Sequence, residues 1–241
     1  MAGKKRFAEF KKNTLPKIKR TVLKGAVIVL ILHIGQIALY KWVAPPITLT
    51  QWHAVLEGFS FEREHVSLNE ISPHLQLAVI SAEDQLFAQH NGFDLDSITK
   101  AIHHNQKGGS VRGASTISQQ TAKNIFLWQG RSWLRKGLEV YYTFVMEKLY
   151  GKKRILELYL NEAEMGPGIF GAQAAARHYF DKSASDLNRR ESALIASCLP
   201  NPKKYSPTHP QAHTQKKTRW VLSQMTYLGT RPNTRKLLYE K

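Results

Sequence analysis

The strongest hydrophobic pattern in the chain is an uncharged run near the N-terminus. The stretch "GAVIVLILHIGQIALY", from Gly25 to Tyr40, contains no Asp, Glu, Lys or Arg and is bracketed by Lys24 and Lys41. A helix that crosses a bilayer needs about 20 apolar residues. The two lysines can extend their ammonium groups to the interface, which lengthens the usable helix. The pattern therefore predicts one transmembrane helix over 21–44.

Beyond residue 71 the apolar positions recur at helical spacing. Ser72-Pro73 is typical of an N-cap followed by proline at the first helical position, and Leu75, Ala78 and Ile80 begin an apolar stripe. The segments "KKRILELYLNEAE", "GAQAAARHYF" and "RRESALIASCLP" each predict a further helix.

A longer helix is predicted over 132–150, where Gly151 ends it. Its apolar positions predict a set of inward-facing side chains: Leu134, Leu138, Tyr141, Tyr142, Val145 and Leu149. By contrast, 45–70 mixes Pro, Thr and scattered aromatics, which indicates an extended linker with at most a short helix or strand. Because no alternating strand pattern of useful length appears, the sequence predicts a mainly α domain over 71–241.

One stretch of the chain is more polar than a core helix would be. In "GASTISQQTAKN", from Gly113 to Asn124, only Ala114, Ile117, Thr121 and Ala122 can face a core. We therefore expect the remaining side chains to face something polar.

The distribution of charge predicts how the apolar helix is oriented. Residues 1–20 hold eight Lys and Arg against Glu9 alone. By the positive-inside rule this basic tail stays in the cytoplasm, and everything after about residue 44 lies outside. A cleaved signal peptide is the alternative, but "LYKWVAPP" offers no small-x-small cleavage site. A buried helix of a soluble protein is a further alternative.

The part of the chain outside the membrane is also basic. After residue 43 it keeps 25 Lys and Arg against 17 Asp and Glu, a net charge of +8 out of +17 for the whole chain. A tethered basic domain is attracted to anionic lipid head groups, and an extracytoplasmic location argues against nucleic acid as a partner. Cys198 is the single cysteine, so no internal disulfide is expected.

Two adjacent acids are the first candidates for chemistry. Glu83 and Asp84, in "SAEDQLFAQHNGFD", follow an apolar helical stretch. An acid at a helix C-terminus faces the negative end of the dipole, which disfavours its ionised form and suits a general base or acid that works near neutral pH. A solvated surface pair is the alternative interpretation.

The second candidate is a mixed-charge cluster in "RSWLRKGLE". Arg135 and Lys136 lie four and three residues before Glu139, so the three share one helix face. A surface ion-pair cluster would look the same. Together with Lys123, Arg131 and the hydroxyls of the polar stretch, however, they provide enough donors for a diphosphate.

The order of the motifs is more specific than any one of them. "EDQLFAQHNGFD", "RGASTISQQTAKN", "RSWLRKGLE…EKLYGKKRILELYLN", "GIFGAQAAARHYF" and "ALIASCLPNPKKYSP" together closely resemble the peptidoglycan glycosyltransferases of family 51, of the monofunctional biosynthetic kind. The resemblance covers 71–207. It implies a lysozyme-like helical domain that polymerises lipid II into a growing glycan strand at the outer face of the bacterial cytoplasmic (inner) membrane, with a single-pass anchor.

The resemblance also assigns roles to residues. It implies that Glu83 is the base that activates the acceptor, and that Glu139 helps to hold the donor diphosphate through neighbouring cations or a divalent ion such as Mg²⁺ or Mn²⁺. The residue set that it implies for substrate binding is Ser115, Gln119, Gln120, Lys123, Arg131, Arg135 and Lys136. Other cell-wall synthesis proteins are expected as partners, although no motif identifies them.

Two alternatives and one departure accompany this interpretation. A lysozyme-like hydrolase or lytic transglycosylase also uses one glutamate on a helical lobe, but a groove that cleaves glycan has no diphosphate to bind with Lys, Arg and Gln. A non-catalytic membrane-anchored scaffold is the other alternative. The departure is Leu86, which stands where the family usually has Arg or Lys.

Overall fold

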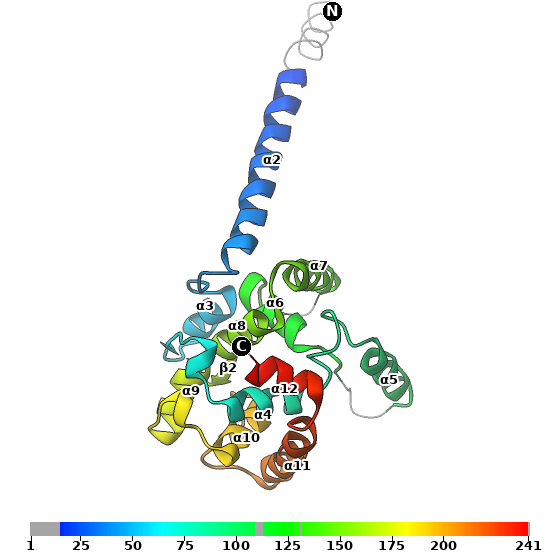
Figure 1. Cartoon of the computed structure of the whole chain (residues 1–241). Coiled ribbons are helices and arrows are strands. Elements are labelled where there is room, and N and C mark those ends of the chain that lie inside the picture. The colour runs from blue at the N-terminus through cyan, green and yellow to red at the C-terminus, as the bar shows by residue number, and fades with distance from the viewer. Residues whose placement is uncertain (1–14, 109–112, 131, 241) are drawn as a thin grey trace, which may run out of the picture. The chain divides into compact units, whose positions relative to one another are not determined.

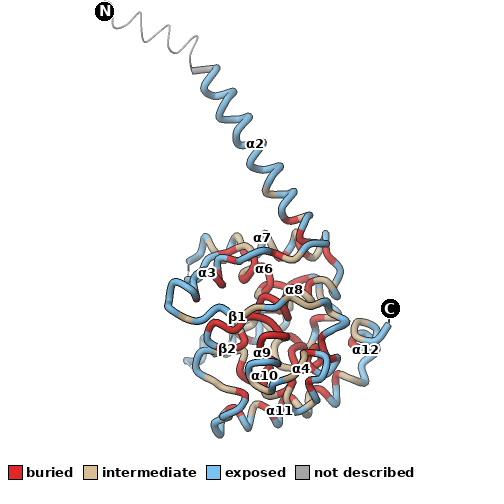
Figure 2. The backbone as a smooth tube through the Cα atoms, turned by 90° about the vertical axis from the view of Figure 1, so that its left-hand side faces the viewer, coloured by how far each residue is buried: buried red, intermediate tan, exposed pale blue. Residues whose placement is uncertain are grey.

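The computed structural model describes residues 15–108, 113–130 and 132–240, and these divide into two compact units at Val43 and Ala44. The described part of the first unit is one long helix, α2 (Leu15–Leu39), followed by a turn. Its apolar side chains are exposed along most of its length (Figure 2), and Lys17–Leu39 is long and apolar enough to cross a membrane. The helix begins before the predicted 21–44 span and ends five residues earlier. Most of the basic tail 1–20 lies outside the described residues.

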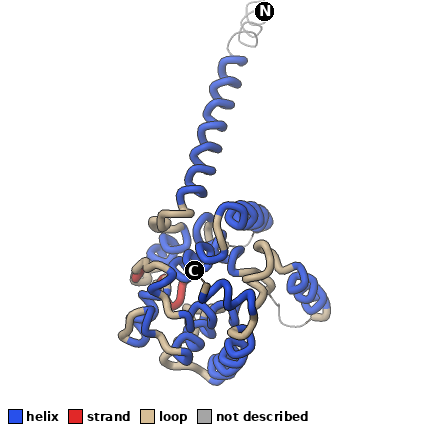
Figure 3. The backbone as a smooth tube through the Cα atoms, viewed as in Figure 1, coloured by secondary structure: helices blue, strands red, loops and turns tan. Residues whose placement is uncertain are grey.

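The second unit is built mainly of helices, with three very short strands (Figures 1 and 3). Its elements in chain order are α3 (Leu49–Leu56), β1 (Glu62–Arg63), η2 (Leu68–Glu70), α4 (Pro73–Glu83), α5 (Leu95–Gln106), α6 (Ile117–Phe126), α7 (Trp133–Leu149), α8 (Lys152–Glu162), β2 (Glu164–Gly166), β3 (Ile169–Phe170), α9 (Ala172–Phe180), η3 (Ala184–Asp186), α10 (Arg189–Cys198), α11 (Ala212–Leu228) and α12 (Pro232–Tyr239).

Helix α4 lies in the core of this unit. The Ser72 hydroxyl accepts a hydrogen bond from the His74 amide, which confirms the predicted N-cap. Every residue from 75 to 81 is buried, because α10 and α11 pack against α4. The strands form a sheet in the order β1-β3-β2, parallel between β1 and β3 and antiparallel between β3 and β2. They are too short to produce an alternating pattern in the sequence.

Helix α7 is confirmed, but its predicted inward face is wrong in part. Leu134 is 70% exposed, and Tyr141 and Leu149 are also exposed, whereas the buried side chains are those of Glu139, Thr143 and Met146. The face that packs toward α6 and α8 is therefore partly polar, and several apolar residues of α7 face outward. Hydrophobic spacing alone does not say which face a helix buries when an ion-pair cluster occupies the other face.

A buried carboxylate fixes the end of α4 against the start of α6. Both oxygens of Asp84 lie near Nε2 of His90, at 2.9 and 3.1 Å, and one of them also accepts a hydrogen bond from the Ile117 amide at 3.0 Å. His90 Nδ1 accepts from the Gly92 amide, so its Nε2 carries the proton that is donated to Asp84. An anion at the N-terminus of α6 also complements the helix dipole.

A second buried carboxylate attaches the segment before residue 71 to α8. Glu162 is fully buried, and its two oxygens are bound by Arg63 Nη2 at 2.5 Å and by Gln51 Nε2 at 2.7 Å. Burial raises the pKa of the Glu162 carboxyl from 4.5 to about 7, although Arg63 and Gln51 oppose that shift. The stretch predicted as a linker over 45–70 thus contains a helix and a strand that are anchored to the domain.

The raised pKa predicts how stability depends on pH. The folded protein binds the Glu162 proton more tightly than the unfolded chain does, so this group should lower the free energy of unfolding as pH rises from about 4.5 to about 7. Glu162→Gln removes this titration, so its stability relative to wild type should rise over that range, by up to about 3 kcal/mol. Unfolding in detergent at several pH values measures the difference. Asp186→Asn, at an exposed acid, should show no such trend.

The Asp84 contacts predict a large stability loss on truncation. Asp84→Ala leaves His90 and the first amide of α6 without their buried acceptor, and hydrogen bonds to a charged group are each worth about 1.5–3 kcal/mol. We expect the melting temperature to fall by several degrees or more. Asp96→Ala, which truncates an exposed acid in the first turn of α5, is the matched control and should cost much less. Equal melting temperatures for the two variants would contradict the structural role of Asp84.

Candidate active site

Glu83 is the last residue of α4, and a hydrogen-bonded chain orients its carboxylate. Gln120 Nε2 donates to Glu83 Oε2 at 2.9 Å, and the Tyr159 hydroxyl donates to Gln120 Oε1 at 3.3 Å. Burial raises the pKa of Tyr159 well above its ordinary value, so Tyr159 stays a neutral donor. The Glu83 side chain is 12% exposed, which leaves it accessible while α6 and α8 restrict its orientation.

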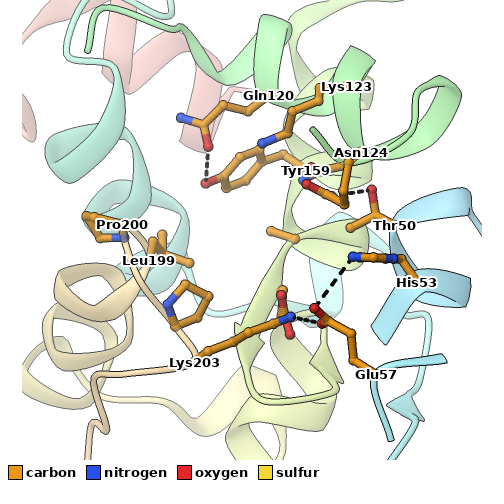
Figure 4. A pocket seen from close by; sticks show the side chains of 14 residues that line it. Thr50, His53, Glu57, Gln120, Lys123, Asn124, Tyr159, Leu199, Pro200 and Lys203 are labelled. Atoms are coloured by element: carbon orange, nitrogen blue, oxygen red, sulfur yellow. Dashed lines mark hydrogen bonds and ion pairs between the residues drawn. The ribbon is translucent and has the colours of Figure 1, made fainter. Parts of the chain in front are cut away.

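A polar cavity of about 380 Å³ begins beside this chain (Figure 4). Gln120, Lys123 and Tyr159 line one end of the cavity, and the opposite end carries charged side chains of α3 and of the loop after α10. There Glu57 pairs with Lys203, and His53 lies 3.5 Å from Glu57. Because its lining is mostly polar, the cavity suits a hydrophilic ligand.

Lys123 presents a largely buried ammonium group in this cavity. Burial lowers the pKa of Lys123; Glu139 opposes the shift most strongly, Arg135 adds to it, and Glu83 opposes it. Within the described part of the chain no hydrogen bond or ion pair engages its Nζ. A buried cation without a direct partner is costly, so an anionic ligand would be favoured at this position.

The mixed-charge cluster on α7 forms as predicted. Arg135 Nη1 donates to Glu139 Oε2 at 3.0 Å, and Lys136 Nζ pairs with the other carboxylate oxygen. Glu139 is buried, whereas Lys136 is partly exposed. The buried Nε of Arg135 has no hydrogen-bond partner among the described residues. The charges of all three residues act on Lys123, which places the cluster near the cavity.

The other predicted substrate-binding residues lie in different settings. Ser115 is exposed, just before the N-cap of α6. Gln119 is buried, and its side-chain oxygen accepts from the Thr116 amide at 3.1 Å in a capping box, which leaves its NH₂ group as the remaining donor. Arg131 lies outside the described residues. Leu86, in the turn after α4, is 38% exposed.

The residues present do not fit a metal site held by the protein alone. Both oxygens of Glu139 are bound by cations, and Glu83 Oε2 is bound by Gln120. Across the described ranges no group of three or more His, Cys, Asp or Glu side chains has an arrangement that could hold an ion. The divalent cation stays a prediction, and no step below depends on it.

Sequence reasoning missed two parts of the site. Helix α3 lines the cavity with Thr50 and His53, and Glu57 follows directly after the helix, all within the stretch predicted as a linker. The signal that was available is the capping box in "TLTQ", where the Thr48 side chain and Gln51 cap the start of α3. The second part of the site that sequence reasoning missed is Lys217 on α11, whose Nζ lies 3.8 Å from Glu83 Oε1. No motif in the sequence indicates this lysine.

The chain is similar to known proteins over most of its length. Residues 51–226 match the family model described as Transglycosylase. The chain is similar to three proteins named biosynthetic peptidoglycan transglycosylase. That of Shewanella oneidensis is 56% identical over 163 residues, which are 68% of this chain and 70% of the relative. That of Aeromonas hydrophila is 47% identical over 226 residues, 89% and 94% of the two chains. That of Pseudomonas aeruginosa is 47% identical over 199 residues, 80% and 86%.

The matched region begins within α3 and ends within α11, so it includes Glu83, the α7 cluster and all residues that line the cavity except Thr50. It therefore covers both the predicted motifs and, Thr50 aside, the two parts of the site that the motifs missed. The chain belongs to the transglycosylase family, and it is a peptidoglycan glycosyltransferase that polymerises glycan strands.

Proposed function

We propose that this glycosyltransferase uses lipid II as its substrate and that Glu83 is its general base. The observation that supports the proposal best is the position of the Glu83 carboxylate, oriented by Gln120 at 2.9 Å and close enough to Lys123 to affect its pKa. A base and an anion-binding cation therefore lie near each other beside the cavity, as a transfer from a diphosphate donor requires.

In the proposed reaction, Glu83 takes the proton of the 4-hydroxyl of the acceptor GlcNAc. The oxygen then forms a bond to C1 of the donor MurNAc, while the bond between C1 and the diphosphate oxygen breaks. The electron pair of that bond leaves with undecaprenyl diphosphate, and the proton stays on Glu83 until solvent removes it. Attack on an α-linked donor from the opposite face gives a β-1,4 bond.

The leaving group needs charge neutralisation more than it needs a proton. Diphosphate leaves readily, and cations placed where negative charge develops lower the barrier. Lys123 would bind its oxygens together with Arg135, whose Nε has no hydrogen-bond partner among the described residues, while Glu139 keeps Arg135 and Lys136 in position. Ser115, Gln119 and Arg131 are proposed to contribute further contacts on the donor side.

The proposed location is the outer face of the bacterial cytoplasmic membrane, with α2 as the anchor. The length and composition of Lys17–Leu39 support the anchor, and the basic residues before it support a cytoplasmic N-terminus. In the second unit, the outward face of α7 includes Trp133, 93% exposed, and Phe144, 56% exposed. An apolar face of this kind suits contact with lipid. Cell-wall synthesis proteins as partners stay a prediction.

Substitution of the two glutamates separates their roles. Glu83→Gln keeps the size and removes the base, so polymerisation of labelled lipid II should fall by about 10²–10⁴-fold, while a donor mimic should still bind. Glu139→Gln should weaken binding of the mimic as well as the rate, because Arg135 and Lys136 lose the carboxylate that holds them in position.

The matched control is Glu64→Gln, which removes an acid from an exposed ion pair with Arg177 and should leave both readouts unchanged. Substantial polymer from a folded Glu83→Gln protein would exclude Glu83 as the base. Unchanged binding of the mimic by Glu139→Gln would exclude the proposed role of the α7 cluster.

A further inference from the structure

Glu83 is held from two sides, and the second side is a lysine of α11. Oε2 accepts the hydrogen bond from Gln120 of α6, whereas Oε1 faces Lys217 Nζ at 3.8 Å. That separation is too long for a hydrogen bond but short enough for a strong charge interaction. Among the described residues Oε1 accepts no hydrogen bond, so the oxygen beside the ammonium group is the one free to receive a proton.

Lys217 is in an unfavourable place for a cation unless Glu83 is charged. Its side chain is only 20% exposed. Burial lowers the pKa of Lys217, and Glu83 is the first group that opposes the shift, followed by Cys198. In the described part of the molecule, Glu83 is the only carboxylate that pairs with it. The cation and the base therefore depend on each other.

The rest of α11 fixes this lysine in place. The adjacent Thr218 is buried, and its hydroxyl hydrogen-bonds to Ser197 of α10 at 3.2 Å. Farther along α11, Gln224 accepts a hydrogen bond from Gln85, two residues after Glu83, at 3.3 Å. Helix α11 is thus held against α10 and against the turn after α4, which fixes the position of the Lys217 backbone near Glu83.

We propose that Lys217 is a positioning residue for the reaction: it holds Glu83 in the ionised state and aims Oε1 at the acceptor hydroxyl. This inference rests on the proposed role of Glu83 as the base. A base must be deprotonated before each turnover, and an ammonium group nearby extends the pH range in which that holds. Lys217 leaves the lone pairs of Oε1 unoccupied, so it stabilises the charge without blocking proton transfer.

Other ionisable groups lie around Glu83, and among the described residues no hydrogen bond or ion pair joins them to Lys217. Lys123 acts on Glu83 from α6, and Tyr159 of α8 is neutral because burial raises its pKa. Asp84 adjoins Glu83 in the chain and is engaged by His90. A change in pH dependence after substitution of Lys217 therefore reports the loss of its charge.

The test is the pH–rate profile of lipid II polymerisation by the full-length protein. Lys217→Met should move the acidic limb of the profile to higher pH by about one unit. At pH values below the limb, kcat should therefore fall by about tenfold. On the alkaline plateau, kcat should stay close to that of the wild type. Lys217→Arg should restore the profile. Lys216→Met removes an exposed lysine one residue away and should match wild type.

The outcomes separate this inference from the proposed function. If the Lys217→Met profile has the wild-type limb, or is lowered equally at every pH, Lys217 does not act through the charge of Glu83. If Lys217→Met does not fold, Lys217→Gln and Lys217→Arg carry the same comparison. Wild-type polymerisation by Glu83→Gln would instead overturn the base itself, whatever the Lys217 variants show.

Discussion

The buried carboxylate of Asp84 joins three segments of the chain that must meet for the site to exist. It ends α4, binds the ring of His90 and accepts the first amide of α6. As a result, Glu83 lies beside the polar face of α6, where Gln120 reaches it. The two adjacent acids therefore have different roles: buried Asp84 holds the helices together, and the partly exposed Glu83 remains available for chemistry.

The cations of the site follow from the packing of α6 against α7. Lys123 comes from α6, and Arg135 and Lys136 come from α7, where buried Glu139 neutralises part of their charge. Without that acid, three cations would repel one another at close range. With it, Lys123 Nζ and Arg135 Nε keep unused donor capacity among the described residues, which is what an anionic ligand requires.

Local sequence signals predicted most of the helices because caps and apolar spacing act over a few residues. Ser72-Pro73 marks the start of α4, and the segments that became α8, α9 and α10 were identified in the same way. Much of the polar stretch lies in α6, where Ser118, Gln119 and Asn124 are buried, so part of its polarity serves capping and packing. A polar residue next to a helix start can face either a ligand or its own backbone, and spacing does not distinguish the two.

The features that the sequence did not reveal depend on contacts between distant segments. Lys217 lies 134 positions after Glu83, and only the packing of α11 on α4 brings them together. The hydrogen bond between Gln51 and Glu162 joins residues that are similarly far apart in the sequence. It holds the stretch that was predicted as a linker against the domain, where part of that stretch lines the cavity. On α7, the apolar spacing correctly predicted a helix but not which face of it is buried, because the buried face is the one that carries Glu139.

A structure of the full chain bound to a donor analogue that carries a diphosphate tests the arrangement of base and cations most directly. We expect diphosphate oxygens within hydrogen-bond distance of Lys123 Nζ and Arg135 Nε, with the sugar carbon on the side that faces Glu83. A diphosphate bound at the opposite end of the cavity, by Lys203, with Lys123 and Arg135 left without it, would contradict the site described above.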